Sequence, residues 1–263
     1  MPIKIIETDC SPLVFDNEYE IIDIDLLANY VGELLLGHHL HICRIINSLK
    51  SVSPVHPNDS IDQVIQKLTT SSKTKRDGWL FQMISWIVLT ERNKGEKYFS
   101  NYPHFAPAQH GIDGLAIVLD KDNNLSRIII TEDKCTTSPR GKITQQVFPE
   151  FQEFEEGKKN NALVSIISSL IGQMDSGNIL EGIQNDIFDN NYRHYRIGIT
   201  RESNHNSIDG RKRLFNNYEK YVTGDNPARR TGASIYLEDL RNWMEDFSTK
   251  VIDFLESKKN TNV

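Results

Sequence analysis

The stretch that decides the fold is HGIDGLAIVLDKDNNLSRIIITEDKC, residues 110–135. It contains two runs rich in β-branched residues, GLAIVLD (114–120) and SRIIITEDKC (126–135). The residues between them, KDNN (121–124), have the composition of a turn. A strand, a turn and a second strand in this order predict a β-hairpin.

Helical patterns lie on both sides of this hairpin. GWLFQMISWIVLTERN (78–93) is apolar almost all round, which is typical of a helix buried against a sheet. Further helices are predicted at about 142–156, 161–174 and 238–257, and HYRIGIT (194–200) is typical of a strand. The pattern therefore predicts an α/β fold with a mixed central sheet flanked by helices.

The first 70 residues have a different character. Apolar residues at helical spacing over 24–49 predict a long helix, with two glycines at which it could break. A segment rich in Pro, Ser and Asn (51–60) predicts a loop, and a short helix follows at 61–69. We therefore expect an N-terminal helical extension over residues 1–70 and a main domain over residues 71–263.

Composition limits the class of protein. Three cysteines lie far apart without a CxxC pair, which favours a reducing compartment over a disulfide framework or a zinc knuckle. No apolar run approaches the roughly 18 residues typical of a membrane span. The N-terminus lacks the basic start and apolar stretch of a secretory signal. These features predict a cytoplasmic globular protein that does not enter a membrane.

Three charged residues of the hairpin are candidates for chemistry. Glu132 and Lys134 lie two positions apart near the end of the second strand, so their side chains point to the same face, while Asp133 points to the other. Asp113 stands at the start of the first strand. Because a hairpin folds the second strand's end beside the first strand's beginning, Asp113, Glu132 and Lys134, hereafter the trio, can converge.

The residue types of the trio suit phosphodiester hydrolysis. The carboxylates of Asp113 and Glu132 are candidate ligands for Mg²⁺ or Mn²⁺, which prefer oxygen donors. The ammonium of Lys134 can orient the attacking water or stabilise negative charge on the transition-state phosphate. The trio is therefore the predicted catalytic site.

GIDG (111–114), followed by a strand, a turn and ITEDK (130–134), resembles the PD-(D/E)XK nuclease superfamily, also called restriction-endonuclease-like. The resemblance covers roughly residues 77–200, where the order of elements is similar to that family's α-β-β-β-α-β core. It implies that the two acids of the trio are metal ligands and that its lysine is the catalytic lysine.

The same resemblance implies accessory residues. Gln82, in the upstream helix, matches a position where many members carry a glutamate or glutamine that touches the metal site. Gln145 or Gln146 resembles a glutamine of the following helix in some subfamilies. The chain departs from the pattern in having Ile112 where proline is common, and Gln82 is a weaker ligand than glutamate. His110 could approach the scissile phosphate or serve as a turn residue.

The resemblance implies an Mg²⁺-dependent nuclease acting on DNA, and the chain is similar to nucleases of bacterial anti-phage defence operons such as Hachiman-type systems. The net charge of −6 predicts weak autonomous attraction to DNA. No phosphate-binding loop of the G-x-x-x-x-G-K-[ST] kind is present. We therefore expect a helicase or ATPase partner.

Three other interpretations stay open. The chain could be a catalytically inactive DNA-binding or regulatory subunit, or a scaffold that docks an ATPase. The trio could also be an ion-paired strand end in an unrelated α/β fold.

Elsewhere, His38, His39, His41 and Cys43 resemble a metal-binding cluster, but no second pair of ligands follows at a suitable spacing. We interpret these histidines as satisfied or surface residues.

Overall fold

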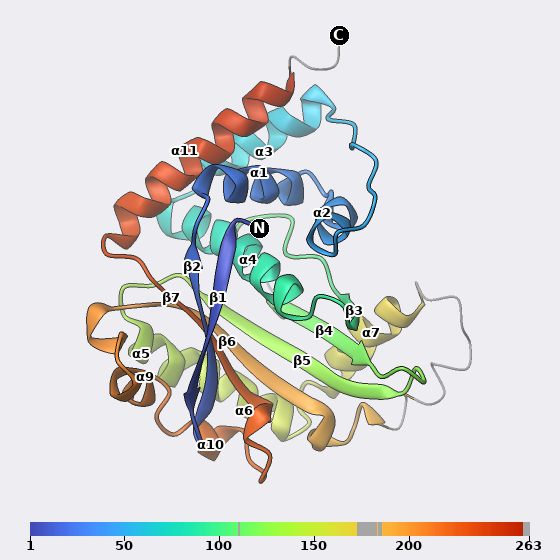
Figure 1. Cartoon of the computed structure of the whole chain (residues 1–263), viewed down its shortest axis with the longest axis vertical. Helices are drawn as coiled ribbons and strands as arrows, with labels where there is room; N and C mark the ends of the chain where they lie inside the picture. Colours follow the sequence, from blue (N-terminus) through green and yellow to red (C-terminus); the bar gives the residue numbers. More distant parts are fainter. Residues whose placement is uncertain (110, 173–182, 184–185, 260–263) are drawn as a thin grey trace.

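The computed structural model of the chain describes residues 1–109, 111–172, 183 and 186–259. Its centre is one mixed sheet, in which seven strands of the described chain lie in the order β1-β2-β7-β6-β5-β4-β3 (Figure 1). The strands are β1 (Ile3–Cys10), β2 (Val14–Ile21), β3 (Lys97–Ser100), β4 (Gly114–Leu119), β5 (Leu125–Lys134), β6 (Arg193–Arg201) and β7 (Arg230–Tyr236). The predicted α/β fold with a mixed central sheet is confirmed.

The predicted hairpin is formed by β4 and β5. The two strands pair antiparallel, with Gly114 opposite Thr131. Their turn contains Asn123 at a φ of 68°, a left-handed conformation that asparagine adopts more readily than most residues. Strand β5 pairs in parallel with β6, and β6 with β7. Both faces of the sheet are covered at the middle of β5, where Ile128 and Ile130 pack in the core of one face and Ile129 packs with Leu89 on the other.

Five helices of the described chain form a helical layer on one side of the sheet, one of them against the strands and the rest farther out (Figure 1). They are α1 (Ile24–Leu35), α2 (His39–Ile46), α3 (Asn58–Thr70), α4 (Lys73–Arg92) and α11 (Leu240–Lys259). Helix α4 contacts β5 on one side and α1 and α11 on the other. Its sequence is apolar almost all round because it lies between the sheet and these helices.

The opposite face is covered by shorter helices. They are α5 (Pro139–Lys142), the π-helical turn Ile143–Val147, α6 (Phe148–Glu155), α7 (Asn160–Ile171), α9 (Ile208–Leu214) and α10 (Tyr218–Tyr221), with 3₁₀ turns at Asn190–Tyr192, Ser203–His205 and Pro227–Arg229. Their core includes Leu115 and Ile130 from the hairpin and Phe148, Phe151 and Tyr218 from the helices. The helices predicted at 142–156 and 161–174 are thus present, the first with a π-helical turn, while residues 173–174 of the second lie outside the described residues.

The prediction that residues 1–70 form a helical extension is wrong for its first part. Residues 3–21 form the hairpin β1–β2, and β2 joins the main sheet by pairing in parallel with β7. The long helix predicted over 24–49 is two helices, α1 and α2. Gly37, at a φ of 91°, lies between them and provides the left-handed backbone needed to end α1.

Buried charged groups attach β2 to the rest of the sheet. Asp16 accepts a hydrogen bond of 2.5 Å from the Ser234 hydroxyl of β7, and Arg211 lies 3.1 Å from the same carboxylate. Glu18 forms an ion pair of 3.0 Å with Arg201 of β6. These acids lie on one face of β2 and are enclosed in the fold, so the sequence does not mark that face as buried.

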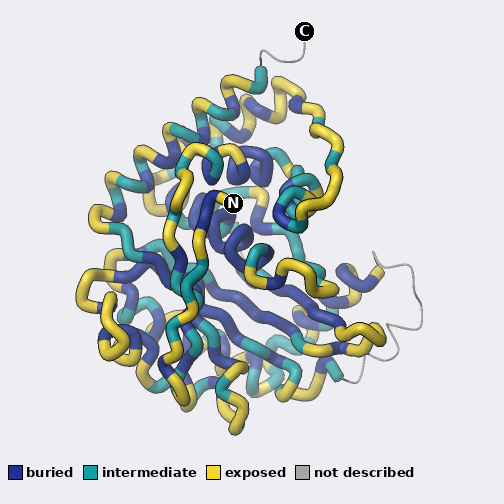
Figure 2. Tube along the Cα trace, in the orientation of Figure 1, coloured by how far each residue is buried: buried dark blue, intermediate teal, exposed yellow. Residues whose placement is uncertain are grey.

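The boundary expected near residue 70 falls inside one hydrophobic core. Buried side chains of α1, α2 and α3, which precede it, pack with those of α4 and α11, which follow it. Figure 2 shows that α4 and the central strands are buried, whereas exposed residues gather on the outer sides of α3 and α11. Among the described residues, no helix is long and apolar enough to cross a bilayer.

Candidate functional site

The β4–β5 hairpin brings the trio together. Because Gly114 pairs with Thr131, Asp113 lies beside the end of β5. The Nζ of Lys134 donates a hydrogen bond of 2.6 Å to Oε2 of Glu132 and lies 3.6 Å from Oδ2 of Asp113. Residues from the start of β4 and the end of β5 therefore form one charged group.

Glu132 is the most enclosed member of the trio. Its side chain is 4% exposed, whereas that of Asp113 is 12% exposed and that of Lys134 is 23% exposed. Glu132 follows Ile128 and Ile130 on the same face of β5, and both isoleucines belong to the core of that face. The trio therefore lies at the end of an apolar layer, with a carboxylate inside and an ammonium nearer to solvent.

Two hydrogen bonds orient the carboxylate of Asp113. Gln82 of α4 donates from Nε2 to Oδ1 over 2.5 Å. The backbone N–H of Asp133 donates to Oδ2 over 3.0 Å. A helix and a neighbouring strand thus hold the same carboxylate, and Gln82 contacts the trio through Asp113.

The charges of the trio shift one another's pKa values. Burial raises the pKa of Glu132 well above its ordinary range, and the charge of Asp113 raises it further, while Lys134 opposes the shift. Burial disfavours the ammonium of Lys134, but the attraction of Glu132 and Asp113 outweighs this and raises its pKa. Lys134 therefore stays charged at neutral pH. A further positive charge near Glu132 would stabilise the ionised form of this carboxylate.

Asp133 points to the opposite face of β5, as strand alternation predicts. Its Oδ1 accepts a hydrogen bond of 2.5 Å from Ser85 of α4, and Nη1 of Arg196 lies 3.5 Å from the same oxygen. Burial raises the pKa of Asp133 to about 6, although Arg196 opposes the shift. Gly198 pairs with Asp133 across β5 and β6, and a Cβ there would lie 1.9 Å from Oδ1. Only glycine leaves room for this carboxylate.

Sequence analysis did not identify the residues that hold Asp133. Ser85 and Arg196 are 111 positions apart, and no local pattern joins them. Gly198 carried a signal, because a glycine inside an apolar strand such as HYRIGIT often marks the close approach of another group.

The other predicted accessory residues differ in position. Gln145 and Gln146 lie in the π-helical turn Ile143–Val147, and their side chains are exposed. Such turns are frequent at functional sites. Glu150, in the helix that follows, is near enough to contribute to the raised pKa of Glu132. His110 lies outside the described residues.

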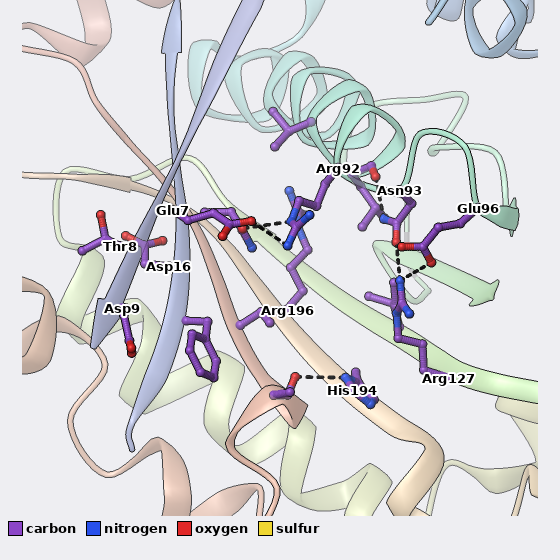
Figure 3. A pocket seen from close by; sticks show the side chains of 17 residues that line it. Glu7, Thr8, Asp9, Asp16, Arg92, Asn93, Glu96, Arg127, His194 and Arg196 are labelled. Carbon is purple, nitrogen blue, oxygen red and sulfur yellow. Dashed lines mark hydrogen bonds and ion pairs between the residues drawn. The ribbon is translucent and has the colours of Figure 1, made fainter. Parts of the chain in front are cut away.

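A cavity of about 610 Å³ lies away from the trio, between β1, β2, α4, β5 and β6 (Figure 3). None of the trio lines it. Two of its arginines form ion pairs, Arg92 with Glu7 at 2.7 Å and Arg127 with Glu96 at 2.5 Å. Arg196, also at the cavity, is the arginine that reaches Asp133. Because its cations are engaged with protein groups, this cavity is a weaker candidate for phosphate chemistry than the trio.

The case for a function depends on the geometry and chemistry of the described residues. No family model matches the chain, no curated protein matches it, and no solved structure matches it.

Proposed function

We propose that the chain is an Mg²⁺-dependent nuclease that hydrolyses phosphodiester bonds of DNA, with Asp113, Glu132 and Lys134 as its catalytic residues. The observation that carries this proposal is the convergence of two carboxylates and a lysine at one end of the β4–β5 hairpin. Burial and the charge of the second carboxylate raise the pKa of Glu132, and acids with strongly shifted pKa values cluster at functional sites.

The donor atoms fit a hard divalent cation. Asp113 and Glu132 supply carboxylate oxygens, and with one ammonium from Lys134 the ionised trio keeps an excess of negative charge. Mg²⁺ and Mn²⁺ favour such oxygen ligands over the nitrogen and sulfur ligands preferred by Zn²⁺. A cation bound there would supply positive charge to polarise the phosphate and lower the pKa of the attacking water.

The residues of the chain then have separate roles. Asp113, held by Gln82 and by the backbone of β5, would present a fixed carboxylate to the cation. Glu132 would present a second carboxylate to the cation, whose positive charge would lower the pKa of Glu132 and favour its ionised form. Lys134 would orient the attacking water or stabilise negative charge on the phosphate oxygens.

The order of elements supports the resemblance to restriction-endonuclease-like enzymes. Helix α4, strands β3, β4 and β5, then helices α5, α6 and α7, and then strand β6 come in this order along the described chain. This is the α-β-β-β-α-β order that the resemblance implies. The contact of Gln82 with Asp113 supports the accessory role inferred for this glutamine.

The proposal includes a helicase or ATPase partner, such as a defence nuclease of the Hachiman type would require. Three arginines that could otherwise contact DNA, Arg211, Arg229 and Arg230, are buried. Arg229 pairs with Glu155 at 2.6 Å, and Arg230 donates to backbone carbonyls. These side chains are engaged inside the protein, and the net charge of −6 favours weak attraction to DNA by the chain alone.

Plasmid nicking with and without Mg²⁺ tests the proposal, with the chain alone and with the complex recovered from its source cell in the presence of ATP. We expect Mg²⁺-dependent cleavage that Glu132→Gln and Asp113→Asn abolish. The matched control is Glu156→Gln, which alters an exposed glutamate paired with Lys158. Cleavage that survives EDTA, or that Glu132→Gln leaves unchanged, contradicts a metal-dependent site here. DNA binding without cleavage by either preparation supports the inactive regulatory subunit instead.

A further inference from the structure

A second cluster of ligand-type side chains lies in the helical layer. Glu33 belongs to α1, His38 lies just before α2, and His56 belongs to the segment that precedes α3. Nδ1 of His38 lies 2.6 Å from Oε2 of Glu33, and Nε2 of His56 lies 2.9 Å from Oε1. One carboxylate therefore bridges two imidazoles from different parts of the chain.

The cluster is enclosed on most sides. The side chains of Glu33 and His56 are 9% and 10% exposed, and that of His38 is 19% exposed. The two imidazole rings meet edge to face, with centroids 5.2 Å apart. Burial opposes ionisation of Glu33, but the hydrogen bonds from both histidines outweigh it and lower the pKa of its carboxyl group. Glu33 is therefore an ionised carboxylate at neutral pH.

The backbone directs His38 toward Glu33. The left-handed Gly37 ends α1, and the backbone N–H of His38 donates to the carbonyl of Glu33 over 2.9 Å. The neighbouring histidines are directed elsewhere: His39 approaches the carbonyl of Gly37, and His41 contacts the hydroxyl of Ser51. Of the three histidines near the start of α2, His38 alone joins this cluster, and its remaining members come from positions that the sequence spacing did not connect.

We propose that Glu33, His38 and His56 bind a divalent transition-metal ion of the zinc class. One ligand atom from each residue lies within 4.8 Å of the others. Ligand atoms on a tetrahedral zinc ion lie about 3.3 Å apart, since each bond is about 2.0–2.1 Å. Measured to the single oxygen Oε2 of Glu33, the two nitrogen–oxygen distances are 2.6 and 3.1 Å, so each would open by less than about 1 Å. Two imidazoles and one carboxylate form a donor set that zinc favours and magnesium does not.

The open side of the cluster suits a water molecule as the fourth ligand, because His38 retains contact with solvent. The ion would connect α1 to residues 47–57, which form no helix or strand. The expected effect is a rise in the unfolding temperature on metal binding, because an ion that binds only the folded state stabilises it.

The test uses the full chain without a histidine tag, carrying Glu132→Gln so that the hairpin carboxylates do not contribute a second site. After treatment with a chelator, Co²⁺ and Zn²⁺ are added separately and binding is followed by visible absorption and calorimetry. We expect one equivalent of Co²⁺ with the intense absorption of a tetrahedral site, displaced by Zn²⁺ and unaffected by Mg²⁺.

Ligand variants complete the test. His38→Ala and His56→Ala should weaken binding by more than the roughly 10–100-fold that loss of an outer-shell partner costs. His41→Ala, which removes a nearby histidine outside the cluster, should bind as the parent does. Absence of Co²⁺ binding to the parent protein overturns the proposal, as does unchanged binding by both ligand variants. If a variant fails to fold, the stoichiometry and spectrum of the parent decide the matter alone.

Discussion

Gln82 donates a hydrogen bond from Nε2 to Oδ1 of Asp113, and this contact joins α4 to the start of β4. The other oxygen of Asp113 accepts from the backbone of β5. The carboxylate is therefore oriented from two directions before any cation binds. Such fixed orientation lowers the free-energy cost of assembling a metal site, because the carboxylate does not have to be ordered when the cation binds.

Gln82→Ala should raise the Mg²⁺ concentration needed for cleavage and lower the rate by roughly 10–100-fold, the usual effect of losing an outer-shell partner. Nicking rates measured over a Mg²⁺ titration check this. Gln152→Ala is the control, because Gln152 is exposed and bonds to Glu156 in the following turn. An unchanged Mg²⁺ dependence in Gln82→Ala would show that the contact has no part in metal binding.

Lys134→Ala should lower the cleavage rate on the order of 10²–10³-fold while DNA binding stays close to that of the parent, because the lysine acts mainly on the transition state. Single-turnover nicking and a binding assay in Ca²⁺ separate the two effects. Lys158→Ala, which removes an exposed ammonium paired with Glu156, serves as the matched variant. Equal loss of binding and cleavage would assign Lys134 to substrate attraction instead.

Metal-free protein should lose stability as the pH rises through the elevated pKa of Glu132. The pKa of Glu132 in the folded protein lies above its ordinary value of 4.5. The contribution of Glu132 to the free energy of unfolding is therefore fully present below pH 4.5 and is lost as the pH rises through the folded-state pKa. Glu132→Gln cannot ionise, so its unfolding temperature should fall less over the same range, by a difference on the order of a few degrees. Thermal unfolding in EDTA at pH 5 to 9 checks this.

The same experiment repeated with Mg²⁺ links stability to the proposed site. At pH values above the pKa of Glu132, the cation should raise the unfolding temperature of the parent protein. It should have little effect on the unfolding temperature of Glu132→Gln. Identical shifts in both proteins would place the stabilising cation elsewhere.

Gly198→Ala should destabilise the fold by at least the roughly 1–3 kcal/mol typical of overpacking, because its Cβ would meet Oδ1 of Asp133. Gly78→Ala is a matched glycine variant in α4, where an added Cβ meets nothing within 4 Å. It should stabilise the helix by roughly 0.5–1 kcal/mol. Denaturant unfolding of the two variants measures both effects, and equal stability would mean that Asp133 readily moves aside.

The hairpin could be predicted because its signal is local. β-branched runs and a turn lie next to one another in β4 and β5, and the convergence of Asp113 with Glu132 and Lys134 follows from strand alternation alone. The apolar sequence of α4 likewise indicated a helix covered on all sides.

The missed parts depend on partners far away in the sequence. Strand β2 carries Asp16 and Glu18, whose burial is compensated by Arg201 and Arg211 near the other end of the chain. No window of sequence contains both members of these pairs. The same reason hid the grouping of His56 with Glu33, since the loop that brings them together has no periodic pattern.

The attachment of β2 to β7 also sets an order of assembly during translation. Asp16 and Ser234, which bond across this junction, are 218 positions apart. Because the hairpin of β1 and β2 is synthesised long before β7, it cannot pair with β7 until the chain has been made past Tyr236. Until then its acidic side chains remain hydrated, which discourages pairing with strands of other nascent chains. The charges that are costly to bury in the finished protein are thus protective while it is being made.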